Sequence, residues 1–140
     1  MTPKEYLTQY RYAVMKAKAA QDHLDDLRAM AERITPKYGG DGGCTHQSSD
    51  KLGAAVARIV DAEAVVDAQI SLLIATAREV QNTIEAVQDE TLRVLLYERY
   101  INGKTFEAIA VQMNYSYVHI VHRLHPKSLE AVKDVIECNT

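Results

Sequence analysis

The sequence predicts an all-α protein in two parts. A long antiparallel helical hairpin, a coiled coil, is expected over residues 1–87, and a small domain containing a helix-turn-helix over residues 88–140. Three observations lead to this prediction. Apolar residues recur at alternating spacings of three and four along two long segments, which is the pattern of a helix packed along one face. A glycine-rich loop, residues 35–50, separates those segments. Shorter apolar repeats, broken by glycine and asparagine, follow them.

The first long helix has clear signals at both ends. Thr2 precedes Pro3, and Glu5 follows within the first turn, as is typical of a capped N-terminus. Thr35-Pro36 is expected to end the helix, since proline disfavours helical conformation in the residue before it. Its apolar line consists of Tyr6, Tyr10, Ala13, Ala17, Ala20, Leu24, Leu27, Ala31 and Ile34.

The second long helix is expected to be capped by Ser48, Ser49 or Asp50. Its apolar line is broken only by Glu63, and a single polar residue in such a seam can set the register of the pairing. The line consists of Leu52, Val56, Ile59, Glu63, Val66, Ile70, Leu73, Ala77, Val80, Ile84 and Val87.

Apolar residues also lie outside this line, at Val60, Val65, Leu72 and Ile74. One partner helix cannot cover all of these positions. The simplest further partner is the same hairpin from a second copy, so a homodimer is expected. The alternative is that these residues pack on the C-terminal domain of the same chain.

The C-terminal part begins with a helix whose apolar face repeats at Leu92, Leu95, Leu96 and Tyr100. Asn102-Gly103 is expected to stop it, because glycine commonly follows the last helical turn.

Two short helices joined by a tight turn follow, which predicts a helix-turn-helix. Thr105 can cap the first helix, Ser116 can cap the second, and Asn114 between them tolerates the left-handed conformation. Ala110 lies where the two helices would approach closely. The residues expected to face inward are Ile109 and Met113, then Ile120 and Leu124, and finally Leu129, Val132 and Ile136 of a closing helix.

Between Glu107 and Glu130 the chain has no carboxylate, although its net charge is -3. Phosphates repel carboxylates, so an acid-free stretch is what a DNA-facing element requires. Ser116 and Tyr117 start the recognition helix, and Arg123 and Lys127 supply fixed charge. Lys104 and Thr105 could hold a phosphate at the start of the preceding helix. The DNA-binding residues expected are Lys104, Thr105, Ser116, Tyr117, His119, His122, Arg123 and Lys127.

Several of these residues have a second interpretation. His119, His122 and His125 can donate hydrogen bonds and gain charge below about pH 6.5, but each also fits an ordinary surface or half-buried position. Val118 and Val121 on the outer face fit either a protein contact or a contact with thymine methyl groups, and Tyr115 is expected in the core. From residue 88 onward, six Lys and Arg stand against seven Asp and Glu, so strong nonspecific DNA binding is not expected.

The C-terminal sequence resembles the fourth conserved region of bacterial sigma factors, a helix-turn-helix that reads promoter DNA. It is more similar to small phage and prophage proteins of Gram-positive bacteria, the ArpU/RinA-like regulators of late transcription and an unassigned related family. "YINGKTFEAIA" and "NYSYVHIVHRLH" are the most specific stretches, and "KEYLTQYR" and "SDKLGAAVARIVDAEA" extend the similarity upstream. Two features depart from the pattern. Ile120 and Leu124 are four residues apart rather than three, and Pro126 should kink or end the recognition helix.

The resemblance implies a DNA-binding transcription regulator whose partner is double-stranded DNA, with RNA polymerase as a further candidate partner. A DNA-packaging or assembly component and a pure protein-interaction module are the alternatives. No enzyme is expected, because the sequence has no phosphate loop and no nucleophile with a base at motif spacing. No cofactor or metal site is expected either, since Cys44, Cys138 and His46 do not make a four-ligand set. Without a membrane-length apolar run or a signal-peptide core, the chain is expected in the cytoplasm of a bacterial host, with free thiols.

Overall fold

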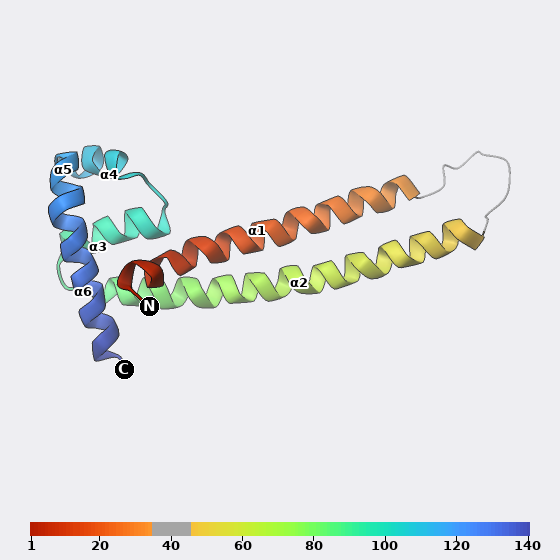
Figure 1. The fold of residues 1–140 in the computed structure, drawn as a ribbon, viewed down its shortest axis with the longest axis horizontal. Coiled ribbons are helices and arrows are strands. Elements are labelled where there is room, and N and C mark those ends of the chain that lie inside the picture. Colours follow the sequence, from red (N-terminus) through yellow and green to blue (C-terminus); the bar gives the residue numbers. More distant parts are fainter. Residues whose placement is uncertain (35–45) are drawn as a thin grey trace. The chain divides into compact units, whose positions relative to one another are not determined.

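The structure is a computed structural model that describes residues 1–34 and 46–140, with side chains described for 1–34 and 50–140. The described residues form helices and no strand, which confirms the all-α class (Figure 1). The glycine-rich loop expected at 35–50 lies largely outside the described residues. The elements are α1 (Pro3–Ile34), α2 (His46–Glu85), α3 (Glu90–Leu96), the π-helical turn η1 (Tyr97–Ile101), α4 (Phe106–Met113), α5 (Tyr117–His119), the π-helical turn η2 (Ile120–Leu124) and α6 (His125–Cys138).

Helix α1 begins and ends where the sequence predicts. The amide of Glu5 donates to Thr2 Oγ1 at 3.2 Å, and the amide of Thr2 donates to Glu5 Oε2 at 2.9 Å, so each residue satisfies the other's free N–H. The start of α2 differs from the prediction. It begins at His46, so Ser48, Ser49 and Asp50 lie inside its first turns instead of capping it.

The chain divides into two compact units, residues 15–72 and residues 1–14 with 73–140. In the first unit, α1 and α2 pack through Leu24, Ala62 and Val66, which are all buried. Arg28 Nη2 and Glu63 Oε1 form an ion pair across the two helices at 3.2 Å. Glu63, which interrupts the expected apolar line, therefore lies at the edge of the contact, where its carboxylate is open to solvent.

The inward face of α2 in this unit is rotated from the expected line. Val56, Glu63 and Ile70 are exposed, and Ala62 is buried in their place. Many inward residues of α1 are alanines, and small side chains on both helices allow a close approach. Exposed apolar residues consequently line other faces of α2, at Val56, Val60, Val65, Ile70, Leu72 and Ile74.

In the second unit, the first residues of α1 and the last turns of α2 belong to one core with the C-terminal helices. Leu7, which the spacing of the apolar line missed, is fully buried there. The Tyr6 hydroxyl lies 2.9 Å from Thr83 Oγ1, joining α1 to α2. The buried members of this core are Leu7, Val80, Ile84, Val87, Leu92, Leu96, Tyr100 and Val132.

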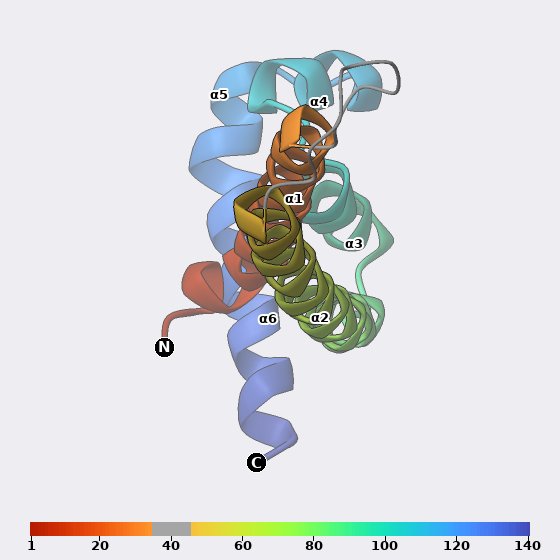
Figure 2. The same cartoon turned by 90° about the vertical axis from the view of Figure 1, so that its right-hand side faces the viewer.

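A second, smaller core joins α3, α4 and η2. Leu95, Ile109, Ala110 and Ile120 are buried together, and Leu124 packs partly against them. The predicted inward positions on both short helices are therefore confirmed. Figures 1 and 2 show α5 and α6 as consecutive parts of one helical segment, with α4 beside its N-terminal end. We call residues 117–127 of this segment the recognition segment.

Candidate nucleic-acid interface

Two capping hydrogen bonds and one left-handed residue define the start of α4 and the turn that follows it. Thr105 Oγ1 accepts a hydrogen bond from the amide of Ala108 at 3.2 Å, and Ser116 Oγ accepts one from the amide of His119 at 3.1 Å. Asn114 adopts the left-handed conformation, with φ 61° and ψ 37°. All three assignments agree with the sequence prediction. The two hydroxyl oxygens are used within the chain, although Thr105 and Ser116 remain exposed.

The helix that contains the recognition segment does not end at Pro126, contrary to the expectation. It contains the π turn η2, in which the amide of His125 donates to the carbonyl of Ile120, and it continues as α6. The proline lacks the N–H that an α-helix would direct to the carbonyl of His122. Because the hydrogen-bond pattern changes type immediately before Pro126, the helix runs past it. A π turn contains one more residue than an α-helical turn, and Ile120 and Leu124, which are four residues apart, lie at its two ends.

The outer side of the recognition segment is polar and cationic around one apolar residue. Tyr117, His122, Arg123 and Lys127 are exposed, and no hydrogen bond or ion pair within the described residues occupies the last three. Val118 is 62% exposed, whereas Ile120 is fully buried. Five of the eight predicted site residues, Tyr117, His119, His122, Arg123 and Lys127, thus lie on this one segment.

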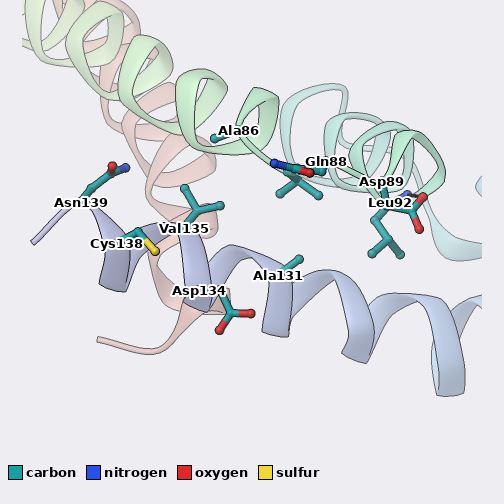
Figure 3. Close-up of a pocket in the computed structure, with 10 residues that line it drawn as sticks. Ala86, Gln88, Asp89, Leu92, Ala131, Asp134, Val135, Cys138 and Asn139 are labelled. Atoms are coloured by element: carbon teal, nitrogen blue, oxygen red, sulfur yellow. Dashed lines mark hydrogen bonds between the residues drawn. The ribbon is translucent and has the colours of Figure 1, made fainter.

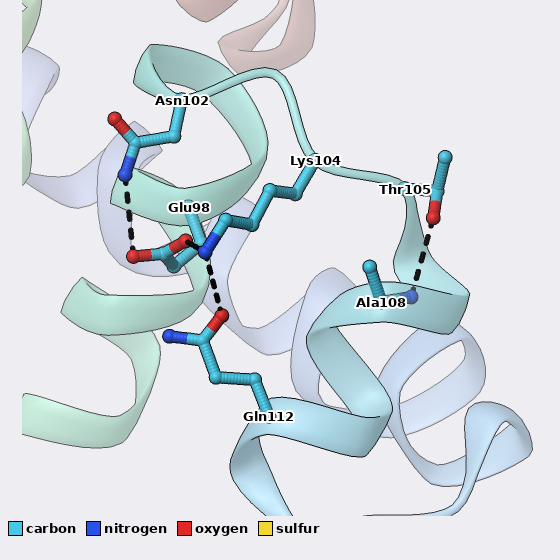
Figure 4. Close-up of polar contacts among 6 residues, drawn as sticks. All are labelled: Glu98, Asn102, Lys104, Thr105, Ala108 and Gln112. Carbon is cyan, nitrogen blue, oxygen red and sulfur yellow. Dashed lines mark hydrogen bonds and ion pairs between the residues drawn. The ribbon is translucent and has the colours of Figure 1, made fainter.

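Lys104, another predicted phosphate contact, is held within the chain (Figure 4). Its Nζ lies 2.6 Å from Glu98 Oε2 and donates to Gln112 Oε1 at 2.8 Å. The Glu98 side chain is only 14% exposed, and Asn102 Nδ2 also donates to it, at 3.2 Å. Hydrogen bonding from Lys104 lowers the pKa of Glu98 below its usual value, so the carboxylate stays charged. Most of the lysine's charge is therefore balanced before any ligand arrives.

His125, considered as a DNA contact, lies in an aromatic cluster instead. Its Nε2 is 2.7 Å from the Tyr100 hydroxyl, and its ring packs edge-on against Phe106 with centroids 4.9 Å apart. The Arg99 guanidinium covers Phe106 at 4.1 Å. Burial, aided by the charges of Lys4 and Arg99, lowers the pKa of His125, while burial raises the pKa of Tyr100.

His119 and Tyr115 lie together at the turn between α4 and α5. Their ring centroids are 5.1 Å apart, and His119 is half-buried. The expectation that Tyr115 lies in the core is wrong, because its side chain is exposed. A tyrosine directly before a capping serine can leave the core without cost to the turn, since Asn114 and Ser116 already fix the backbone.

Sequence reasoning missed Glu98 and Gln112, the residues that hold Lys104. Glu98 lies six residues before Lys104 and Gln112 eight residues after it, across a turn containing Gly103 at φ 69°. Charge complementarity between Glu98 and Lys104 was visible in the sequence, but the reversal that joins them was not.

Two shallow hollows lie away from the recognition segment. One, of about 470 Å³, is formed by the connection between α2 and α3, the start of α3, and α6 (Figure 3). Asp89 and Asp134 line it, and their negative charge would repel the phosphates of a nucleic acid. The other, lined by Glu85, Arg93, Val94 and Tyr97 among others, also holds several carboxylates. Neither contains a predicted DNA contact.

Among the described residues, no helix is both long and apolar enough to cross a membrane. Comparisons of the chain with protein-family models, curated proteins and solved structures found no match.

Proposed function

We propose that this chain is a phage or prophage transcription regulator that binds double-stranded DNA through the recognition segment. The observation that carries the proposal is the outer side of that segment, which presents His122, Arg123 and Lys127 without any carboxylate from residue 108 to residue 129. The rest of the domain is not basic. The segment therefore presents cations in a stretch that carries no acid, as phosphate contact requires.

The backbone around the turn supports the same proposal. Thr105 and Ser116 cap the two helices, Asn114 takes the left-handed turn, and Ile109 packs with Ile120 inside. This arrangement, like a sigma-region-4 helix-turn-helix, leaves the start of the second helix exposed for a DNA groove. The exposed hydroxyl and amide groups at Ser116 and Tyr117 then lie where base and phosphate contacts concentrate.

A homodimer is the second part of the proposal. Six apolar residues of α2 are exposed in the single chain, at Val56, Val60, Val65, Ile70, Leu72 and Ile74. A second copy of the hairpin arm would cover them. Two recognition segments in one particle would also double the few cationic contacts each chain can make.

Selection of bound duplexes from random DNA, with the mass of the protein in solution measured alongside, tests the proposal. Lys127→Ala should weaken binding of the selected duplex, and Lys133→Ala serves as the matched control. Both lysines are exposed residues of α6, but Lys133 lies outside the recognition segment. Equal weakening by both substitutions would show that binding depends on net charge alone. No selected sequence at low salt would overturn the proposal.

A protein-interaction module, with RNA polymerase as a candidate partner, is the second function to test. One observation favours it. Val111 on α4 is 80% exposed, and a branched apolar side chain so open to water gains from a protein contact. Val111→Ser would weaken polymerase binding under this function and leave DNA binding unchanged under the first.

A further inference from the structure

The most exposed apolar side chain of the recognition segment is Val118. It is 62% exposed, and it precedes the buried Ile120 by two positions, which places it on the opposite side of the helix. Val121 beside it is only half-buried, and Leu124 packs inward. The domain's own core therefore does not explain the valine at this position.

The neighbours of Val118 define what kind of surface it would meet. Tyr117 and Ser116 precede it, His122 follows one turn later, and Arg123 and Lys127 lie further along. These groups donate hydrogen bonds or carry positive charge, and no carboxylate is present in the stretch. An apolar group ringed by donors and cations complements the major groove, where phosphates border an edge of acceptors and the thymine C5 methyl.

Resting on the proposed function, we infer that Val118 reads thymine in the DNA site by contact with its C5 methyl group. A valine offers no hydrogen bond, so it cannot distinguish bases by donors and acceptors. It can distinguish thymine from cytosine by the methyl that thymine alone carries in the major groove. The preferred half-site consequently contains thymine opposite the start of the recognition segment.

Deoxyuridine tests this inference because it differs from thymidine only by the missing methyl. Each thymine of the selected duplex is replaced in turn, and affinity is measured for the full chain and for Val118→Ala. For the unaltered chain, one or two replacements should weaken binding about fourfold, the effect of losing one buried methyl. The same replacements should have no effect on Val118→Ala.

Val94→Ala provides the matched control, because Val94 is an exposed valine of α3 outside the recognition segment. This variant should keep the full sensitivity to deoxyuridine. Both substitutions are at exposed positions, and circular dichroism verifies that the helices are retained.

The outcomes separate the two proposals. Selective DNA binding that ignores every deoxyuridine, or Val118→Ala with unchanged sensitivity, overturns the thymine inference and leaves the proposed function standing. Absence of any DNA binding overturns both. A protein partner that loses affinity for Val118→Ala while DNA does not would assign the valine to that partner instead.

Discussion

The Tyr100 hydroxyl and His125 Nε2 are 2.7 Å apart, and this contact joins the helix before the helix-turn-helix to the end of the recognition segment. Tyr100 is buried, and His125 is half-buried between it and Phe106. A neutral imidazole can accept a hydrogen bond from the tyrosine hydroxyl at Nε2, whereas a protonated imidazole can only donate one to the hydroxyl oxygen. The direction of this hydrogen bond therefore depends on the charge of one histidine.

The first prediction is that stability of the domain falls as pH falls below about 6.5. The pKa of His125 is lowered in the folded chain, so the unfolded chain takes up a proton first and is favoured as the pH drops. The loss should stay below about 1.4 kcal/mol per pH unit, since the half-exposed ring is screened by solvent. Urea unfolding at about pH 7.5 and about pH 5.5 measures it.

Two variants isolate the cause. His125→Gln should remove this part of the pH dependence, and His122→Gln, at an exposed histidine of the same segment, should retain it. Tyr100→Phe should cost about 1 kcal/mol at neutral pH through the lost hydrogen bond. An unchanged pH profile in His125→Gln would assign the dependence to other groups.

Lys104 is predicted to act on stability more than on DNA affinity. Lys104→Ala removes the ion pair with Glu98 and the hydrogen bond to Gln112, and should lower the free energy of unfolding by about 1 kcal/mol at neutral pH. The lowered pKa of Glu98 means that this stabilisation is present above about pH 4.5 and disappears as the carboxylate is protonated. The variant and the parent should therefore converge in acid.

Lys127→Ala is the comparison for Lys104, since Lys127 is exposed and unpaired among the described residues. It should leave urea unfolding unchanged and weaken DNA binding. The reverse pattern, in which Lys104→Ala affects only DNA affinity, would mean that the lysine leaves Glu98 to meet a phosphate.

The two faces of α2 are predicted to respond differently to a charge. Val66 is buried against α1, so Val66→Asp should cost about 2–4 kcal/mol and loosen the packing of the two helices. Ile70 is 42% exposed, so Ile70→Asp should leave the helices intact and reduce the mass in solution if the proposed homodimer uses this face. Circular dichroism and sedimentation distinguish these outcomes. If the unaltered chain is helical and monomeric in solution, the homodimer proposal is overturned.

The salt dependence of DNA binding should be shallow. With Lys104 already paired, Arg123 and Lys127 are the free fixed charges of the recognition segment. Each phosphate contact contributes about 0.9 to the slope of log affinity against log salt, which predicts about -2 per chain and about -4 for two engaged chains. A slope beyond about -6 would require basic residues from outside this surface.

Local signals predicted the helix caps and the turn around α4 and α5. Thr105, Asn114 and Ser116 act within a few residues of themselves, and each has the predicted conformation or hydrogen bond. The inward positions Ile109 and Ile120 follow from the same short spacing. Such features are readable because the chain neighbours alone determine them.

Features that depend on distant segments were harder to predict. The spacing of α2 predicted Ile70 on the packed face, whereas Ala62 is buried against α1 and Ile70 is 42% exposed. Leu7 lies outside the expected apolar line of α1, and it is buried because it packs with Val80 and Ile84 of α2. The sequence left His125 open between a DNA contact and an ordinary surface or half-buried position, because its partner, Tyr100, is 25 positions away.

The π turn at Ile120–Leu124 changes how this segment can tolerate changes in length. Five residues occupy a turn that an α-helix would close with fewer, so the segment accommodates one additional residue without a loop. Deleting Val121 should let the turn return to an α-helix and rotate Arg123 and Lys127 relative to Val118. A one-codon deletion would then change which side of the helix Arg123 and Lys127 share with Val118, while the helix itself persists. Recognition at this segment can thus vary through a change in length as well as through substitution.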